Sequence, residues 1–295
     1  MNKSAPFPLS LAHQTLGGLQ LWTDHLYRAG YRIQRHALTG HWRLIDAHNR
    51  RLVSGQRDEC DTRLEQEMPR SVWNEVNEPF VVLLHGLMRT SFCMRPLQRW
   101  LLKAGFKHVT RFAYASTRAS ILDHGAALVS YIQSLPPHSR LSFVGHSMGN
   151  IVLRAAIGQL RHAADGGLSD TLLARFHRVV MLGPPNQGAM IARRLAKTRL
   201  FGLISGSSAM ELGPHWPQVN HMLATPPCPF AILAGDRSAG MLQNPLVEGP
   251  SDYFVRVEEA WLEGAQEFAT LPLPHAILMT DRRALEFVTR FLKQD

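Results

Sequence analysis

Ser147 stands at the centre of the pentapeptide GHSMG, residues 145–149, a Gly-x-Ser-x-Gly pattern. An apolar run, residues 141–144, precedes the pentapeptide, and a helical pattern, residues 150–160, follows it. A sharp turn from a buried strand into a helix lifts a serine hydroxyl clear of the sheet, and glycines are needed where a Cβ would collide with neighbouring backbone. The pattern therefore predicts a nucleophilic serine. The alternative is an ordinary glycine-rich turn with a capping serine.

A serine hydroxyl needs a base to take its proton and a third group to orient that base. In a strand–turn–helix context these groups follow one another along the chain as Ser, then Asp or Glu, then His. His275 lies in the loop after the last predicted strand, residues 268–273, and we expect it to be the base. Four other histidines follow the serine, of which the last two stay open as alternatives: His162, His177, His215 and His221.

Two aspartates could orient this histidine. Asp236 directly follows a predicted strand, residues 230–234, and Asp252 lies farther along the chain. Spacing alone leaves both open, and either carboxylate could instead accept hydrogen bonds from buried backbone amides.

An acyl-transfer site also needs two N–H donors for the developing oxyanion. The first is the backbone amide of Met148, which directly follows the serine at the start of the predicted turn into the helix. The second should come from the loop after the first strand of the predicted sheet, where Gly86 allows a tight turn and Leu87 can offer its amide.

The elements that must position these residues alternate between strand and helix over residues 79–295, which predicts a mostly parallel sheet with helices on both faces. Residues 189–228 interrupt the alternation and predict a cap over the site, either movable or fixed. Residues 1–78 read as a separate N-terminal extension, with a helix over 16–27 and a short hairpin within 31–53. We expect it to cover one side of the main domain; a lid, a membrane-docking surface or a partner surface is the alternative.

The composition of the chain limits the partners and the location that we expect for it. The chain has 295 residues, a formal charge of +9 and a pI near 10.0. Its cations are spread along the chain without a nucleic-acid-binding module, so we expect no nucleic-acid partner, although peripheral contact with an anionic membrane surface is compatible with this charge. The three scattered cysteines, the lack of a bilayer-spanning apolar run and the lack of a secretory signal together indicate a cytoplasmic protein.

Three segments carry a resemblance to a known group. LHGL at 84–87, GHSMG at 145–149 and LGPPNQG at 182–188 resemble bacterial lipases and esterases of the α/β-hydrolase superfamily. The resemblance covers residues 79–295 and implies the α/β-hydrolase fold, with a small N-terminal α+β extension outside it.

The resemblance also bears on which aspartate orients His275. That group places the catalytic aspartate in an Asp-Gly-x-Val segment about twenty residues before the histidine. Asp252 stands 23 residues before His275 in the sequence Asp-Tyr-Phe-Val, so the resemblance favours Asp252 and leaves Asp236 as second choice. Tyr253 replaces the expected glycine. Asn186 and Gly188 are expected to shape the pocket wall.

These features predict a serine hydrolase that cleaves carboxylic esters of lipid or acyl type, with Ser147, Asp252 and His275 as the triad. No metal-binding or phosphate-cradling motif occurs, so neither a metal nor an organic cofactor is expected. Acyl transfer, such as acetyl transfer, by the same triad and a non-catalytic scaffold are the alternatives. The oligomeric state is left open.

Overall fold

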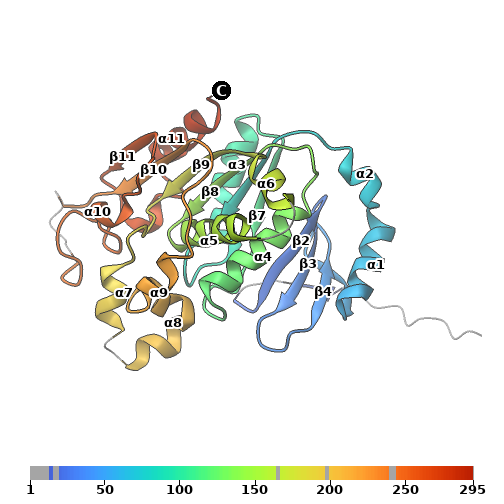
Figure 1. Ribbon diagram of the computed structural model, residues 1–295, viewed down its shortest axis with the longest axis horizontal. Helices are drawn as coiled ribbons and strands as arrows, with labels where there is room; N and C mark the ends of the chain where they lie inside the picture. Colours follow the sequence, from blue (N-terminus) through green and yellow to red (C-terminus); the bar gives the residue numbers. More distant parts are fainter. Residues whose placement is uncertain (1–12, 16–19, 164–166, 197–198, 239–243, 295) are drawn as a thin grey trace, which may run out of the picture.

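The main sheet of the computed structural model is parallel and six-stranded, in the order β11-β10-β9-β8-β6-β7 (Figure 1). The structure describes residues 13–15, 20–163, 167–196, 199–238 and 244–294, without the side chains of 13–14 and 199–205. The strands are β6 (Phe80–Leu84), β7 (His108–Phe112), β8 (Leu141–His146), β9 (Phe176–Leu182), β10 (Phe230–Gly235) and β11 (Glu267–Leu271).

Helices cover both faces of this sheet. On one face lie α4 (Ile121–Gln133) and α5 (Met148–His162); on the other lie α3 (Arg95–Lys103) and α11 (Arg282–Leu292). Successive residues of β6 join opposite cores, Val82 with α4 and α5 and Val81 with α3 and α11. Burial on both faces explains why the central strands read as continuous apolar runs. The predicted fold class is confirmed.

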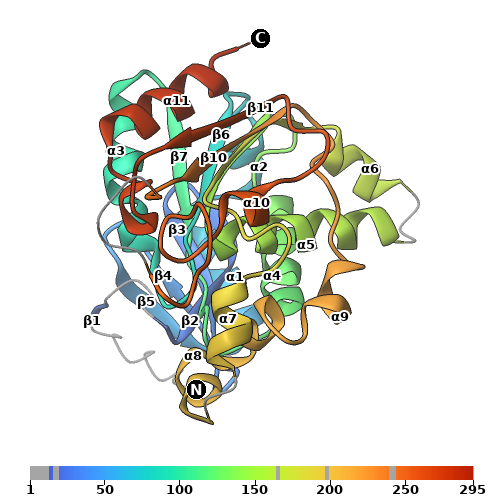
Figure 2. The same cartoon turned by 90° about the vertical axis from the view of Figure 1, so that its left-hand side faces the viewer.

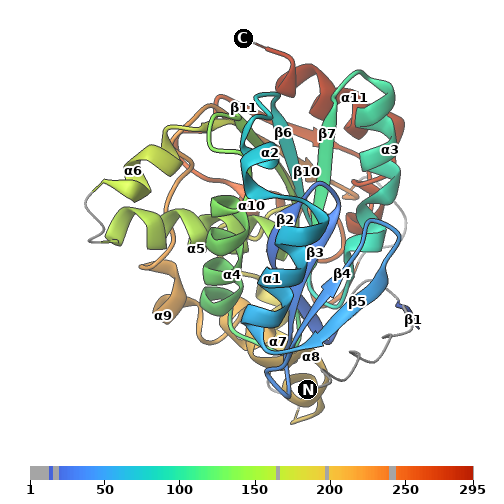
Figure 3. The ribbon, with the colours of Figure 1, turned by 90° about the vertical axis from the view of Figure 1, so that its right-hand side faces the viewer.

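The N-terminal part forms a second, antiparallel sheet with its own small core. Its order is β1-β5-β4-β3-β2, and α1 packs across it (Figure 3). The elements are β1 (His13–Gln14), β2 (Trp22–Arg28), β3 (Tyr31–His36), β4 (Trp42–Ile45), β5 (Arg50–Gly55), α1 (Arg57–Glu67) and α2 (Arg70–Asn74). The hairpin strands expected within 31–53 are present, and the extension packs on the main domain. The domain boundary at residue 78 stays a prediction.

The helix predicted over residues 16–27 is wrong. Residues 16–19 lie outside the described part of the chain, and β2 occupies Trp22–Arg28. The apolar side chains of this segment fit a helical period, but pairing with β3 and docking on the main domain decide the outcome. Asp24 is fully buried there: its amide donates to Ala113 O and its carboxylate accepts from Ala113 N, both at 2.8 Å. These tertiary bonds require an extended backbone.

Three helices are inserted between β9 and β10, below the sheet in Figure 2: α7 (Met190–Leu195), α8 (Arg199–Leu212) and α9 (Trp216–Asn220). The insertion is attached to the start of α4, where Ile121 N donates to Glu211 at 2.6 Å and Ser208 Oγ donates to Ala119 O at 2.8 Å. Gly206 kinks α8 with a φ of 75°, and a Cβ there would lie 1.9 Å from Thr117 O. A side chain at this position would therefore push the insertion away from the main domain.

The remaining elements are short: η1 (Ser91–Met94), α6 (Leu168–Leu173), α10 (Val257–Ala260) and η2 (His275–Ile277). Within the described parts of the chain, none of the helices has the length and apolar character needed to cross a membrane.

Candidate active site

Ser147 occupies a strained turn between β8 and α5. Its backbone has φ 54° and ψ −127°, a region that non-glycine residues rarely adopt. Such a conformation costs on the order of 1–3 kcal/mol and persists only where surrounding contacts impose it. Here Ser147 N donates to Leu182 O at 2.8 Å, and Asn150 Nδ2 donates to Ser147 O at 3.0 Å. The turn is therefore fixed from β9 and from the first turn of α5.

The loop after β6 lies directly against this turn. A Cβ at Gly149 would lie 2.7 Å from the carbonyl oxygens of Leu84 and His85, and one at Gly86 would lie 3.0 Å from Ser147 Cβ. Only glycine at position 149 allows the helix to approach the loop so closely. The close approach brings the backbone of 86–87 beside the serine.

Two backbone amides lie at this contact, those of Leu87 and Met148. Met148 N is in the first turn of α5, where no intrahelical acceptor exists. Among the described residues, neither this amide nor that of Leu87 donates to another group. Both are available to an oxygen atom beside Ser147.

Asp252 is bonded to His275. The distance from His275 Nδ1 to Asp252 Oδ2 is 2.5 Å, and His275 N donates to Asp252 O at 3.0 Å. The other carboxylate oxygen accepts from the amides of Val255 and Phe254 at 2.8 and 3.0 Å. The carboxylate, only 1% exposed, therefore holds the imidazole in one orientation and leaves Nε2 for another partner.

Asp236 is placed differently. Its Oδ1 accepts from Ser238 N at 2.9 Å, and its amide donates to Leu271 O at 2.8 Å. It lines a separate cavity with Glu248 and Arg256. The structure thus brings Asp252, and not Asp236, to His275. The histidines at 162, 215 and 221 are exposed and line no part of the cavity described below.

Tyr253 adopts the geometry of the glycine that it replaces. Its φ is 83°, in the region that favours glycine. Asn244 Nδ2 donates to Tyr253 O at 2.6 Å, and Arg237 Nε donates to its hydroxyl at 3.3 Å. Tyr253 thus has the backbone conformation that the expected glycine would favour, and contacts with Asn244 and Arg237 hold it there.

Ser147 and His275 open into one cavity of about 340 Å³. Its other lining residues are mostly apolar: Gly86, Leu87, Met88, Arg89, His146, Pro185, Ala189, Ile191, Ala192, Leu195, Leu212, Phe254, Val255 and Ala276. In the described residues the two side chains face the cavity without a hydrogen bond between them, as is common in sites without a ligand. The insertion carries four further apolar residues whose side chains lie outside the described part of the chain: Leu200, Phe201, Leu203 and Ile204.

The strand-end segment contributes less to the wall than expected. Pro185 lines the cavity, whereas Asn186 is buried behind it and Gly188 does not reach it. Arg154 donates to Asn186 Oδ1 at 3.2 Å, and Asn186 Nδ2 donates to Ala260 O at 2.9 Å. Asn186 therefore ties α5 to the segment after the Asp252 loop.

Two buried histidines, His85 and His146, lie beside the residues of the site. Burial lowers the pKa of His85 to about 4, and burial together with His275 lowers that of His146 well below its usual value. His85 stacks on Tyr114 at 4.1 Å, and His146 Nε2 lies 3.0 Å from His275 O. Both imidazoles are neutral at pH 7, so His146 positions the His275 backbone without adding a competing charge. Sequence reasoning offered no signal for this contact beyond the place of His146 in the pentapeptide.

Part of the chain matches a known family. Residues 76–182, which include Leu87 and Ser147, match the family described as "Putative serine esterase (DUF676)". No curated protein sequence matches the chain.

Solved structures of similar fold include a lipase of Bacillus licheniformis in mature form, with 17% identity, a TM-score of 0.58, and coverage of 73% of this chain and 92% of that one. A metagenomic carboxyl esterase has 15% identity, a TM-score of 0.53, and coverage of 74% and 76%. Phospholipase PlaB of Legionella pneumophila, in complex with thio-NAD, has 19% identity, a TM-score of 0.54, and coverage of 73% and 58%. At these identities the likeness establishes the fold.

Proposed function

From the premise that this chain has the α/β-hydrolase fold, we propose that it is a serine hydrolase cleaving carboxylic esters of lipid or acyl type. One observation carries the proposal: the Asp252–His275 pair and the strained Ser147 open into the same apolar cavity. The match to a serine esterase family over the serine-bearing half of the fold supports it.

The chemistry follows from the positions of the three groups. His275 Nε2 takes the Ser147 proton as Oγ attacks the acyl carbon, and the same proton then passes to the departing alcohol. Water, activated by His275, attacks the acyl-enzyme and releases the acid. Asp252 holds the imidazole with its Nδ1–H toward the carboxylate and stabilises the cation that forms at each step.

The free amides of Leu87 and Met148 are assigned to the oxyanion. They are fixed before the reaction by the loop contact and by α5, so no reorganisation is needed as negative charge develops. Each such donor contributes on the order of 2.7–4 kcal/mol to transition-state stabilisation.

The apolar lining favours acyl groups over charged ones. Each buried methylene contributes about 0.8 kcal/mol to binding, so kcat/KM should rise from acetyl esters to chains of roughly C4 to C10. Ile191→Trp narrows the cavity and should lower kcat/KM for the longer esters more than for acetyl. Leu102→Trp, at an exposed position of α3, is the matched control and should leave the profile unchanged.

Two measurements test the proposal. A fluorophosphonate should label the protein with loss of fluoride, and Ser147→Ala should not be labelled. A series of p-nitrophenyl esters of increasing length should give the rise just described. A preference for acetyl esters that falls steadily with length would point to small-acyl chemistry instead. Absence of labelling in a folded protein would overturn the proposal.

A further inference from the structure

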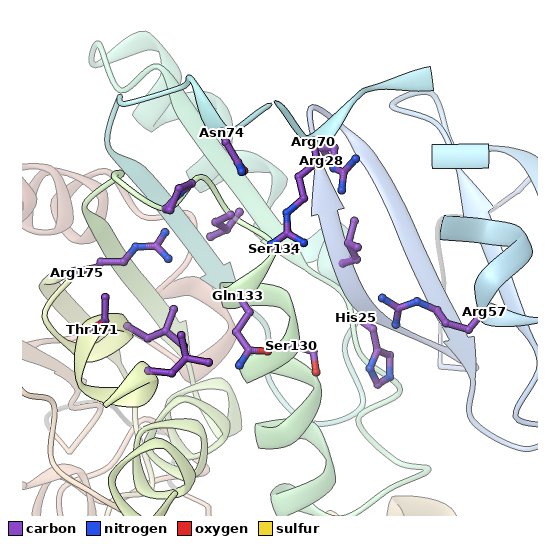
Figure 4. A pocket seen from close by; sticks show the side chains of 15 residues that line it. His25, Arg28, Arg57, Arg70, Asn74, Ser130, Gln133, Ser134, Thr171 and Arg175 are labelled. Carbon is purple, nitrogen blue, oxygen red and sulfur yellow. The ribbon is translucent and has the colours of Figure 1, made fainter. Parts of the chain in front are cut away.

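A second cavity, of about 560 Å³, lies between the N-terminal sheet and the main domain. Its walls come from β2, α1 and α2 on one side and from α6 and its neighbourhood on the other, with the end of α4 as the floor (Figure 4). This volume is within the range of small-molecule sites. None of its lining residues belongs to the Ser147 cavity.

The lining is strongly cationic. Four arginines face the cavity, Arg28, Arg57, Arg70 and Arg175, and no aspartate or glutamate is among its lining residues. Figure 4 shows the first three on the side of the N-terminal sheet and Arg175 opposite. The four cations thus come from two parts of the fold that are distant in sequence.

Two of these arginines form ion pairs with carboxylates, and the charge of Arg70 also acts on Glu65 without an ion pair. Arg28 pairs with Glu65 at 2.7 Å and Arg57 with Asp61 at 2.8 Å. Within the described part of the chain, the side chains of Arg70 and Arg175 form no ion pair with a carboxylate.

Arg175 is held in place before any ligand arrives. Its Nε donates to Ser139 O at 3.2 Å and one terminal nitrogen donates to Pro136 O at 2.7 Å. Burial lowers its pKa, in keeping with a cation that lacks a charged partner. Arg28 is similarly fixed, with one terminal nitrogen donating to Glu65 and to Met68 O.

We propose that this cavity binds the phosphoryl group of a small organic phosphate. Guanidinium groups match phosphate oxygens in pairs, and a phosphate monoester, with up to two negative charges, can satisfy arginines that arrive from both walls. Ser130, Gln133 and Thr171 add polar groups, while Leu172 and the half-exposed Leu168 offer apolar surface for the organic part. The inference does not depend on the proposed esterase activity.

A ligand that touches both walls binds only when the N-terminal sheet is docked. Binding should therefore stabilise the folded chain and raise its melting temperature with ligand concentration. The effect should exceed that of chloride at the same ionic strength, because screening alone acts on all surface charges equally.

The experiment uses the full chain and sn-glycerol 3-phosphate, measured by thermal shift and by calorimetric titration. Arg70→Gln and Arg175→Gln each remove a guanidinium that forms no ion pair with a carboxylate, and each should weaken binding about tenfold or more, because charge-assisted hydrogen bonds to the phosphate are lost. Arg99→Gln is the matched control, an exposed arginine on α3 outside the cavity. Arg70 is exposed, so its variant should fold normally even if Arg175→Gln does not.

Vesicles of phosphatidylcholine with and without phosphatidic acid identify the source of the phosphate. Binding of the free ester alone indicates a soluble metabolite; binding to phosphatidic acid that Arg70→Gln weakens indicates a lipid headgroup. Either result supports the proposal. Stabilisation no greater than that by chloride, with vesicle binding equal in wild type and Arg70→Gln, would overturn it, as would an equal loss in Arg99→Gln.

Discussion

The Ser147 cavity and the arginine cavity at the N-terminal sheet are built on opposite physical principles. The Ser147 cavity is mostly apolar, is supported by neutral imidazoles and has one buried carboxylate fixed on His275. The cavity at the N-terminal sheet is lined by four arginines and no carboxylate. One suits the transfer of an acyl group away from water; the other suits an anion held by charge. The comparison shows that the net charge of +9 does not by itself locate a site for an anion. The positions of the arginines in the folded chain locate it.

The largest expected effect distinguishes the role of the Ser147 cavity in ester turnover from that of the arginine cavity. Ser147→Ala should reduce ester turnover by a factor on the order of 10⁶, because the nucleophile of a triad acts as one unit with its base. Arg70→Gln should leave turnover close to wild type. Both variants are assayed with a p-nitrophenyl ester at saturating concentration, with folding checked by circular dichroism. A Ser147→Ala protein that retains substantial turnover would contradict the assignment of the first cavity.

The second prediction tests which aspartate is the acid of the catalytic triad. Asp252→Asn should lower kcat by a factor on the order of 10⁴, because the amide cannot hold His275 in the required tautomer. Asp236→Asn is the matched control: its carboxylate contacts Ser238 and not His275, so kcat should change little. Pre-steady-state acylation rates for the two variants measure the difference directly. The reverse ranking would move the acid to Asp236.

The smallest effect compares His25, which lines the arginine cavity, with His124, which does not. Burial, with help from Arg57 and Arg35, lowers the pKa of His25 to about 4; burial, with help from His85, lowers that of His124 to about 3. If an anion binds among the arginines, it offsets the repulsion at His25 and should raise that pKa, leaving His124 unchanged. NMR titration of the imidazole protons with and without sn-glycerol 3-phosphate measures both. Equal shifts at the two histidines would contradict binding of the anion in the cavity that His25 lines.

The lowered pKa values of His25 and His124 also determine how the stability of the folded chain changes as the pH falls. Both histidines are neutral in the folded chain and take up a proton in the unfolded chain below its pKa of about 6.5. Their contribution to stability is therefore present above pH 6.5 and is lost as the pH falls toward 4 for His25 and toward 3 for His124. Urea unfolding between pH 7 and 4 should show this loss, and His124→Leu should reduce its slope by up to one proton.

Prediction from the sequence succeeded where local patterns suffice. The alternation of apolar strands and helices gave the parallel sheet, and the turn at Ser147 could be placed because a buried run precedes it and a helix follows. The helix prediction for residues 16–27 was wrong because contacts with residues distant in the sequence decide the structure there. Its apolar spacing fits a helix, whereas bonds from Asp24 to the end of β7, 89 residues away, require a strand.

Hydrophobic period and glycine placement within short segments are enough to predict the sheet, the sharp turn that carries Ser147, and the set of residues able to act beside it. The folded chain settles which aspartate meets His275, since the Asp252 loop folds back to His275 while Asp236 contacts Ser238. It alone also gathers Arg28, Arg57, Arg70 and Arg175, which come from β2, α1, α2 and the start of β9. Groups so far apart along the chain carry no common local pattern, and their convergence depends on the docking of the N-terminal sheet against α4.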